Sequence, residues 1–198
     1  HFEGHNGPDA IKRKSPAKDE PWHFFQPFDN SDDKLLLLIQ DHYDRLVQAL
    51  KDDDQIRAAF EASWLAHALV DGLTPAHHFP FEEKLVELRN GRSLASRMTV
   101  RDRIIIPGET RVEQVGKNWK YWGPKGLFMT HSAFEWGVAT ILLPLSLKSG
   151  LPDETYIAEF RELGPIEWFV RTAKEIASMG IYHTFYTRGW TPKLARKV

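Results

Sequence analysis

The sequence contains no cysteine, which excludes disulfide bonds, thiolate zinc sites and cysteine nucleophiles together. An excess of charge of one sign is also missing, because 26 Lys and Arg stand against 27 Asp and Glu, for a formal net charge of −1. No global electrostatic field therefore points to nucleic acid or acidic lipid. The longest apolar runs, 35–39 and 141–145, fall far short of the roughly 20 residues that span a bilayer.

What the sequence does contain is enough apolar material for one ordinary domain, which we place over residues 1–198. Hydrophobic residues make up 42% and aromatic residues 12% of the 198 positions. Nine His and seven Trp are many for this length. Because cysteine is absent, any transition metal must be bound by His, Asp and Glu. The first residues have neither a charged n-region nor an apolar h-region, so we expect no signal peptide in this chain.

Hydrophobic residues spaced by three and four predict helices along most of the chain. A helix over 34–50 follows an N-cap signal at 31–33, and a second follows Asp52 to Asp54 and runs to about Val70. The second helix is expected to end at Gly72 and Pro75. Further helices are expected over 81–88, 127–147, 153–162 and 165–179, so the fold class is all-α. The inward positions expected on the second helix are Ile56, Phe60, Trp64 and Leu65.

Residues 92–125 form a basic insertion, with eight Lys and Arg against three acidic residues, a balance of +5. Residues 99–106 and 110–115 flank Pro107-Gly108 and are expected to form a β-hairpin. Interleaved Trp119, Tyr121 and Trp122 suit contact with a polyanion or with an anionic membrane surface, a peripheral contact without a transmembrane segment. The alternative is a solvated hairpin whose aromatic side chains pack inward.

Seven side chains have the spacing and chemistry of metal ligands. Two pairs are four residues apart within expected helices, so the members of each pair share one helical face. Imidazole with carboxylate on one face suits zinc, and two such faces can form a site in a helical bundle. Both pairs lie in apolar runs, where unpaired ionisable groups are costly. The pairs are His67 with Asp71 and His131 with Glu135; the other candidates are His77, Asp9 and His23.

These residues resemble a known family, the zinc-dependent phospholipase C and single-strand zinc nuclease superfamily. His67-x3-Asp71-x5-His77, with Gly72 and Pro75 inside it, is similar to the core motif. His131-x3-Glu135 is similar to the second helical pair, in the form with Glu that phospholipases carry. Asp9 and His23 match the upstream ligands in order and separation.

The resemblance implies a multi-helix fold, clustered zinc ions and hydrolysis of phosphodiester bonds. One zinc would be held by four of the residues and a second by three, with Asp71 reaching a third ion. Asp9 would also orient or deprotonate the attacking water, so Asp9 and Asp71 are the candidate catalytic residues. The expected ligands are Asp9, His23, His67 and Asp71 for the first zinc, and His77, His131 and Glu135 for the second.

The third zinc site of this family takes its remaining ligands from an N-terminal Trp and from a first helix, and neither is recognisable before Asp9. We therefore expect either that this helix lies outside the sequence or that the site holds two zinc ions; His1 and His5 are a weaker substitute. Members of this kind are typically exported, which predicts a secreted or extracytoplasmic protein.

Two further residues are candidates for substrate binding. Lys12 stands where the nuclease branch has a phosphate-contacting Arg, and Phe24 suits a base or a lipid headgroup. The leading substrate is a phospholipid, because Glu135 matches the phospholipase form. Phe24 and the basic insertion favour the alternative, a single-strand nuclease or nucleotidase of the same fold. A non-catalytic member with structural zinc is the third interpretation.

Overall fold

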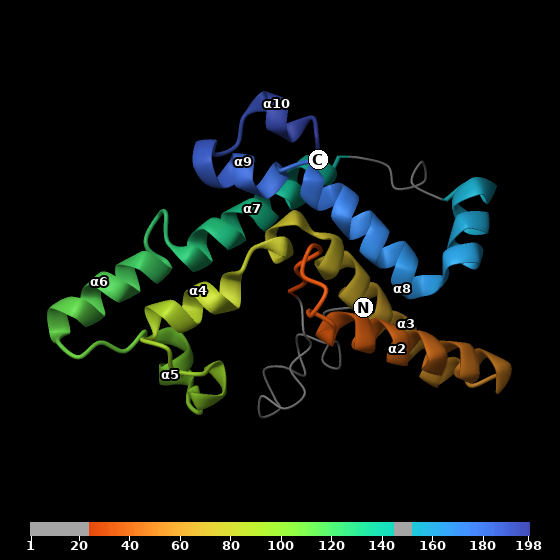
Figure 1. Ribbon diagram of the computed structural model, residues 1–198, viewed down its shortest axis with the longest axis horizontal. Coiled ribbons are helices and arrows are strands. Elements are labelled where there is room, and N and C mark those ends of the chain that lie inside the picture. The colour runs from red at the N-terminus through yellow and green to blue at the C-terminus, as the bar shows by residue number, and fades with distance from the viewer. Residues whose placement is uncertain (1–23, 145–151) are drawn as a thin grey trace. The chain divides into compact units, whose positions relative to one another are not determined.

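The computed structural model describes residues 24–144 and 152–198 and is helical throughout these ranges, without a strand (Figure 1). Asp9, Lys12 and His23 lie outside the described residues. An all-α fold is therefore observed. The helices are α2 (Lys34–Lys51), α3 (Gln55–Leu73), α4 (Phe81–Leu88), α5 (Val100–Ile104), α6 (Arg111–Trp122), α7 (Leu127–Leu142), α8 (Glu154–Ser178), α9 (Ile181–Arg188) and α10 (Pro192–Ala195), with 3-10 turns η2 (Pro75–His78) and η3 (Leu94–Ser96).

The described residues divide into two compact units. The first contains residues 24–79 and 152–180, hence α2, α3, η2 and α8. The second contains residues 80–144 and 181–198, hence α4 to α7, α9 and α10. None of the described helices is both long enough and apolar enough to cross a membrane.

The core of the first unit is formed where α2, α3 and α8 pack together around Leu35, Ile39 and Phe169, all fully buried. Gly72 permits the close approach of these helices, because a Cβ at that position would lie 2.5 Å from Leu35 Cδ2 and 2.7 Å from Phe169 Cζ. The chain therefore continues helically through Gly72 to Leu73, beyond the end near Val70 that the sequence predicts. The close packing also fixes the backbone next to Asp71.

The inward face of α3 differs from the expected one. Ile56 is 88% exposed and Phe60 is also exposed, whereas Ala58 and the fully buried Glu61 point inward. Glu61 occupies an interior position because it pairs there with His42 of α2. A charged residue on the inner face shifts the apparent hydrophobic pattern, so the prediction for Ile56 and Phe60 was wrong.

The second unit has two aromatic clusters. Leu85, Ile106 and Tyr121 pack under α4 and α6. Phe134 of α7 is fully buried against α9 and stacks on Trp190, with ring centroids 5.3 Å apart. Gly137 admits the Trp190 indole, since a Cβ there would overlap it. These contacts fix which face of α7 remains for His131 and Glu135.

The basic insertion forms two helices, so the expected β-hairpin was wrong. Thr99 and Asp102 cap α5 reciprocally: Asp102 N donates to Thr99 Oγ1 (3.2 Å) and Thr99 N to Asp102 Oδ2 (3.0 Å). Thr110 caps α6 by accepting from Glu113 N (3.2 Å). Two Thr-x-x-acid capping signals thus outweigh the β-branched composition of the segment.

Helices α2, α4, α7 and α8 follow the predicted pattern closely, whereas α9 and α10 were not predicted. α2 and α4 begin where expected, and the turn after α4 has positive φ at Asn90 and Gly91. α8 covers both helices expected over 153–162 and 165–179, with non-helical Gly164 (φ 74°) and Pro165 at the predicted break. α7 ends at Leu142 rather than 147, and the last of those expected residues lie outside the described ranges.

Candidate metal centre

His67 and Asp71 lie one turn apart on α3, with His67 Nε2 3.3 Å from Asp71 Oδ2. The imidazole is buried, while the carboxylate is half-buried. Ala68 and Gly72 hold this part of α3 in the core, so the neighbouring pair is presented on a fixed helical face. The predicted i, i+4 pairing of His67 and Asp71 is present.

His77 lies in η2, the 3-10 turn that follows α3. Thr74 N donates to Asp71 O (2.9 Å), Pro75 opens η2, and His77 N donates to Thr74 O (2.9 Å). His77 O accepts from Phe25 N (3.0 Å), and the half-buried Phe24 ring lies 5.1 Å from the His77 ring. The His77 imidazole is therefore positioned by the hydrogen bonds of its backbone and by the contact of its ring with Phe24.

His78 holds the same turn in place. Its ring is within hydrogen-bond distance of Gly72 O, 2.9 Å from Nε2. Desolvation lowers the pKa of His78, which favours the neutral ring, although the hydrogen bond to Gly72 opposes the shift. The neutral ring donates from Nε2 and ties η2 back to the end of α3.

His131 and Glu135 form the equivalent pair on α7, with His131 Nε2 3.1 Å from Glu135 Oε1. The Phe81 ring lies 5.3 Å from the His131 ring. Phe134, between the two donors in sequence, points into the core. Residues four apart share one helical face, so His131 and Glu135 lie on a common face of α7, with Phe134 buried beside it.

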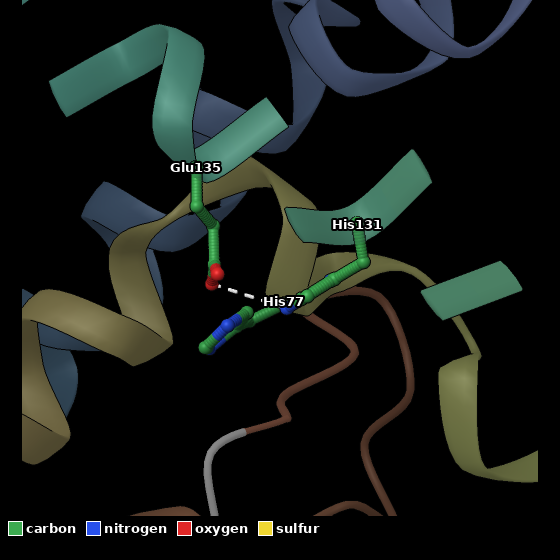
Figure 2. A group of neighbouring side chains, drawn as sticks. All are labelled: His77, His131 and Glu135. Atoms are coloured by element: carbon green, nitrogen blue, oxygen red, sulfur yellow. Dashed lines mark ion pairs between the residues drawn. The ribbon is translucent and has the colours of Figure 1, made fainter. Parts of the chain in front are cut away.

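Three of the predicted ligands, His77, His131 and Glu135, are a donor set that could hold a metal ion, and Figure 2 shows the ion pair that joins the two donors of α7. Donor atoms about 2.0–2.1 Å from a tetrahedral zinc are about 3.3 Å apart. The separation of 3.1 Å between His131 Nε2 and Glu135 Oε1 is close to that value. Two imidazoles with one carboxylate are a donor set that zinc accepts.

The other expected ligands are placed differently. Within the part of the chain that the structure describes, His67 and Asp71 are paired with each other but are not members of the group of three. Asp9 and His23 belong to the undescribed residues, as does the candidate substrate residue Lys12. Phe24, the other candidate for substrate binding, contacts His77.

Tyr182 of α9 is a neighbour of the group that the sequence does not reveal. Burial raises the pKa of its hydroxyl, and the negative charges of Tyr186 and Glu135 raise the pKa further. Its ring packs edge-on against Phe134 at 5.1 Å. A single Tyr in a segment with no motif gives no signal, so only the packing of α9 on α7 identifies it.

Comparison of the chain with family models, with curated proteins and with solved structures finds no match.

Proposed function

We propose that the protein is a zinc-dependent hydrolase of phosphodiester bonds, similar to phospholipase C. The observation that carries this proposal is the donor group of His77, His131 and Glu135. Its support is chemical: the three residue types and their spacing in the sequence suit zinc, as does the 3.1 Å separation of His131 Nε2 from Glu135 Oε1. The paired His67 and Asp71 offer a second set of donors of the same kind.

In the proposed site, His77, His131 and Glu135 would bind one zinc ion. As the family resemblance implies, His67 and Asp71 would bind another together with Asp9 and His23, and Asp71 would also reach a further ion. Zinc, when bound, supplies an activated water at neutral pH and takes up negative charge that develops on the phosphate. No side-chain nucleophile is required.

The chain's own residues then have distinct tasks. The Phe24 ring and the Phe25 amide hold His77, so its imidazole does not have to be ordered when metal binds. Asp9 orients the attacking water or accepts its proton, and Lys12 offers a positive charge to a phosphate oxygen. Asp71 and Glu135 are only half-buried, so the carboxylate side of each pair is open to substrate.

The leading substrate is a phospholipid, following the Glu at position 135. A nuclease or nucleotidase is the second candidate, because Phe24 is only half-buried beside His77 and an accessible aromatic ring can stack on a base. Parallel assays on phosphatidylcholine and on single-stranded DNA distinguish them.

The test combines elemental analysis with hydrolysis of bis-p-nitrophenyl phosphate before and after chelation. We expect stoichiometric zinc and chelator-sensitive hydrolysis, and we expect His131→Ala to contain less zinc and to lose the hydrolysis. The matched control is His183→Ala, an exposed histidine on α9, which should retain zinc and activity. Zinc without hydrolysis would support the non-catalytic alternative, and absence of zinc from the purified protein after zinc addition would refute the metal centre.

A further inference from the structure

Helix α6 presents four apolar residues to solvent, while several of its polar residues contact the protein. Val112, Val115, Trp119 and Trp122 follow the spacing i, i+3, i+7 and i+10, which places them along one face. They are 84%, 71%, 68% and 37% exposed. We refer to these four residues as the α6 stripe.

Polar contacts fix the rotation of α6 so that the stripe faces outward. Asn118 Oδ1 accepts from Ile106 N (3.0 Å) and Asn118 Nδ2 donates to Ile106 O (2.8 Å). Lys117 Nζ donates to Asn90 Oδ1 (2.6 Å), and Tyr121 is buried on the same inner side. Turning the stripe inward would break these contacts and expose Tyr121, so the outward orientation is built into the fold.

The carboxyl end of α5 is tied to the end of the stripe. Trp122 Nε1 donates to Ile104 O (2.7 Å), and the Ile104 side chain is itself exposed. A contiguous apolar row on a surface marks a binding face, because each Val or Trp side chain gains free energy when water is excluded from it.

Positive charge borders this row. Arg111 and Lys120 of α6 and Arg101 and Arg103 of α5 are exposed. Of the three acidic residues in this segment, Asp102 caps Thr99 and Glu113 pairs with Lys117, which leaves the exposed Glu109 against the four exposed cations. The free charge beside the stripe is therefore basic.

We propose that α6 lies flat on an anionic phospholipid surface. The stripe enters the headgroup region, where Trp side chains partition favourably, and Arg111 and Lys120 meet lipid phosphates. This inference rests on the unit that contains α6 and does not require the metal centre. If the proposed hydrolase is also correct, the surface would bring the enzyme to a lipid substrate.

The arrangement favours lipid over nucleic acid. A single-stranded nucleic acid is bound by aromatic residues lying in a basic groove, with cations along the contact. The α6 stripe has no cation within it, and two of its four members are Val, which have no ring to stack on a base. Apolar residues in the middle with cations at the border match a bilayer interface.

Co-sedimentation of the full chain with vesicles tests the proposal, comparing phosphatidylcholine vesicles that contain phosphatidylserine with vesicles of phosphatidylcholine alone. We expect binding to the anionic vesicles that weakens as salt is raised. Val115→Ser with Trp119→Ser should reduce the affinity about tenfold or more. Matched controls are Ile56→Ser and Tyr156→Ser, which remove exposed apolar side chains outside α6 and should bind normally.

A second measurement uses the protein with its stripe intact: brominated acyl chains should quench tryptophan fluorescence, and Trp119→Phe should reduce the quenching. Absence of binding to anionic vesicles, or equal losses in the control variants, would overturn the proposal. It would also be overturned if single-stranded DNA bound with the same dependence on Trp119, or if Trp119→Ser dissociated a dimer and left vesicle binding intact.

Discussion

The fully buried carboxylate of Glu61 on α3 contacts the His42 ring of α2, with Oε2 of Glu61 2.5 Å from Nδ1 of His42. Its other oxygen, Oε1, pairs with Arg57 one turn earlier on α3. The His42 ring stacks on Trp64 at 5.3 Å with an interplanar angle of 18°. A charged group inside the first unit is thus compensated on both oxygens, and it joins two of the three long helices of that unit.

Removing one partner of this pair should be more costly than replacing both. We expect His42→Leu to lower the free energy of unfolding by about 3 kcal/mol, since it leaves a buried carboxylate short of a partner. The double variant His42→Leu, Glu61→Leu should be less destabilised than the sum of the single changes. Urea unfolding of the four proteins measures this coupling. Additive effects would show that the pair is not energetically coupled.

Gly72 should not tolerate a larger side chain. A methyl group there would collide with Leu35 and Phe169, so we expect Gly72→Ala to destabilise the protein by about 1–3 kcal/mol. Because Asp71 is adjacent, zinc content should fall as well. Gly116→Ala is the matched control: it lies within α6 with open space around the added Cβ, and should stabilise by about 0.5–1 kcal/mol. Equal effects from thermal melts of the two variants would contradict the close approach.

Glu113 should contribute to acid stability. Hydrogen bonds from Lys117 and from the Glu109 amide, together with Lys117's charge, lower the pKa of Glu113 from 4.5 to about 2. A carboxyl group whose pKa is lower in the folded state stabilises the fold above its unfolded pKa and loses that effect as pH falls through the folded pKa.

The stability difference between the unaltered protein and Glu113→Gln should therefore be constant above pH 4.5 and shrink toward pH 2. Denaturant unfolding at a series of pH values measures it. A difference that does not change with pH would exclude the proposed ionic origin.

Metal removal should destabilise the protein if the donor group binds zinc. Chelation leaves the donors without the ion that compensates the Glu135 charge, so the thermal midpoint should fall and recover on adding zinc. Glu135→Gln should bind zinc more weakly and respond less to the chelator. Tyr156→Ser, whose residue is remote from the donors in sequence, is the control. A midpoint insensitive to chelator and zinc would count against the centre.

Local signals in the sequence were sufficient for much of the fold. Three-and-four spacing placed α2 and α4, although the N-cap residue of α2, Asp33, makes no side-chain capping hydrogen bond, and Gly164-Pro165 placed the break within α8. The errors come from competition between signals: in 99–115 the β-branched residues and Pro-Gly suggested a hairpin, whereas Thr99 and Thr110 cap helices. Buried Glu61 misled the assignment of the inner face of α3, because its partner His42 is 19 residues away.

For the candidate site, helical spacing was enough to pair His67 with Asp71 and His131 with Glu135. No local pattern in the sequence assigns His77 to the same metal ion as the α7 pair; the family resemblance supplied that expectation. Tyr182 could not be predicted, because α9 itself had no recognised signal and the influence of Tyr182 arises from packing against α7.

The space left by the missing side chain of Gly137 makes α7, which contains His131 and Glu135, dependent on a distant part of the chain. The Trp190 indole fills that space and stacks on Phe134. It also donates a hydrogen bond from Nε1 to Ala133 O (3.3 Å), 57 residues away in the sequence. Shortening the polypeptide to end before Trp190 would leave a cavity beside α7 and expose Phe134 to water. Such a cut would loosen both donors although it removes neither of them.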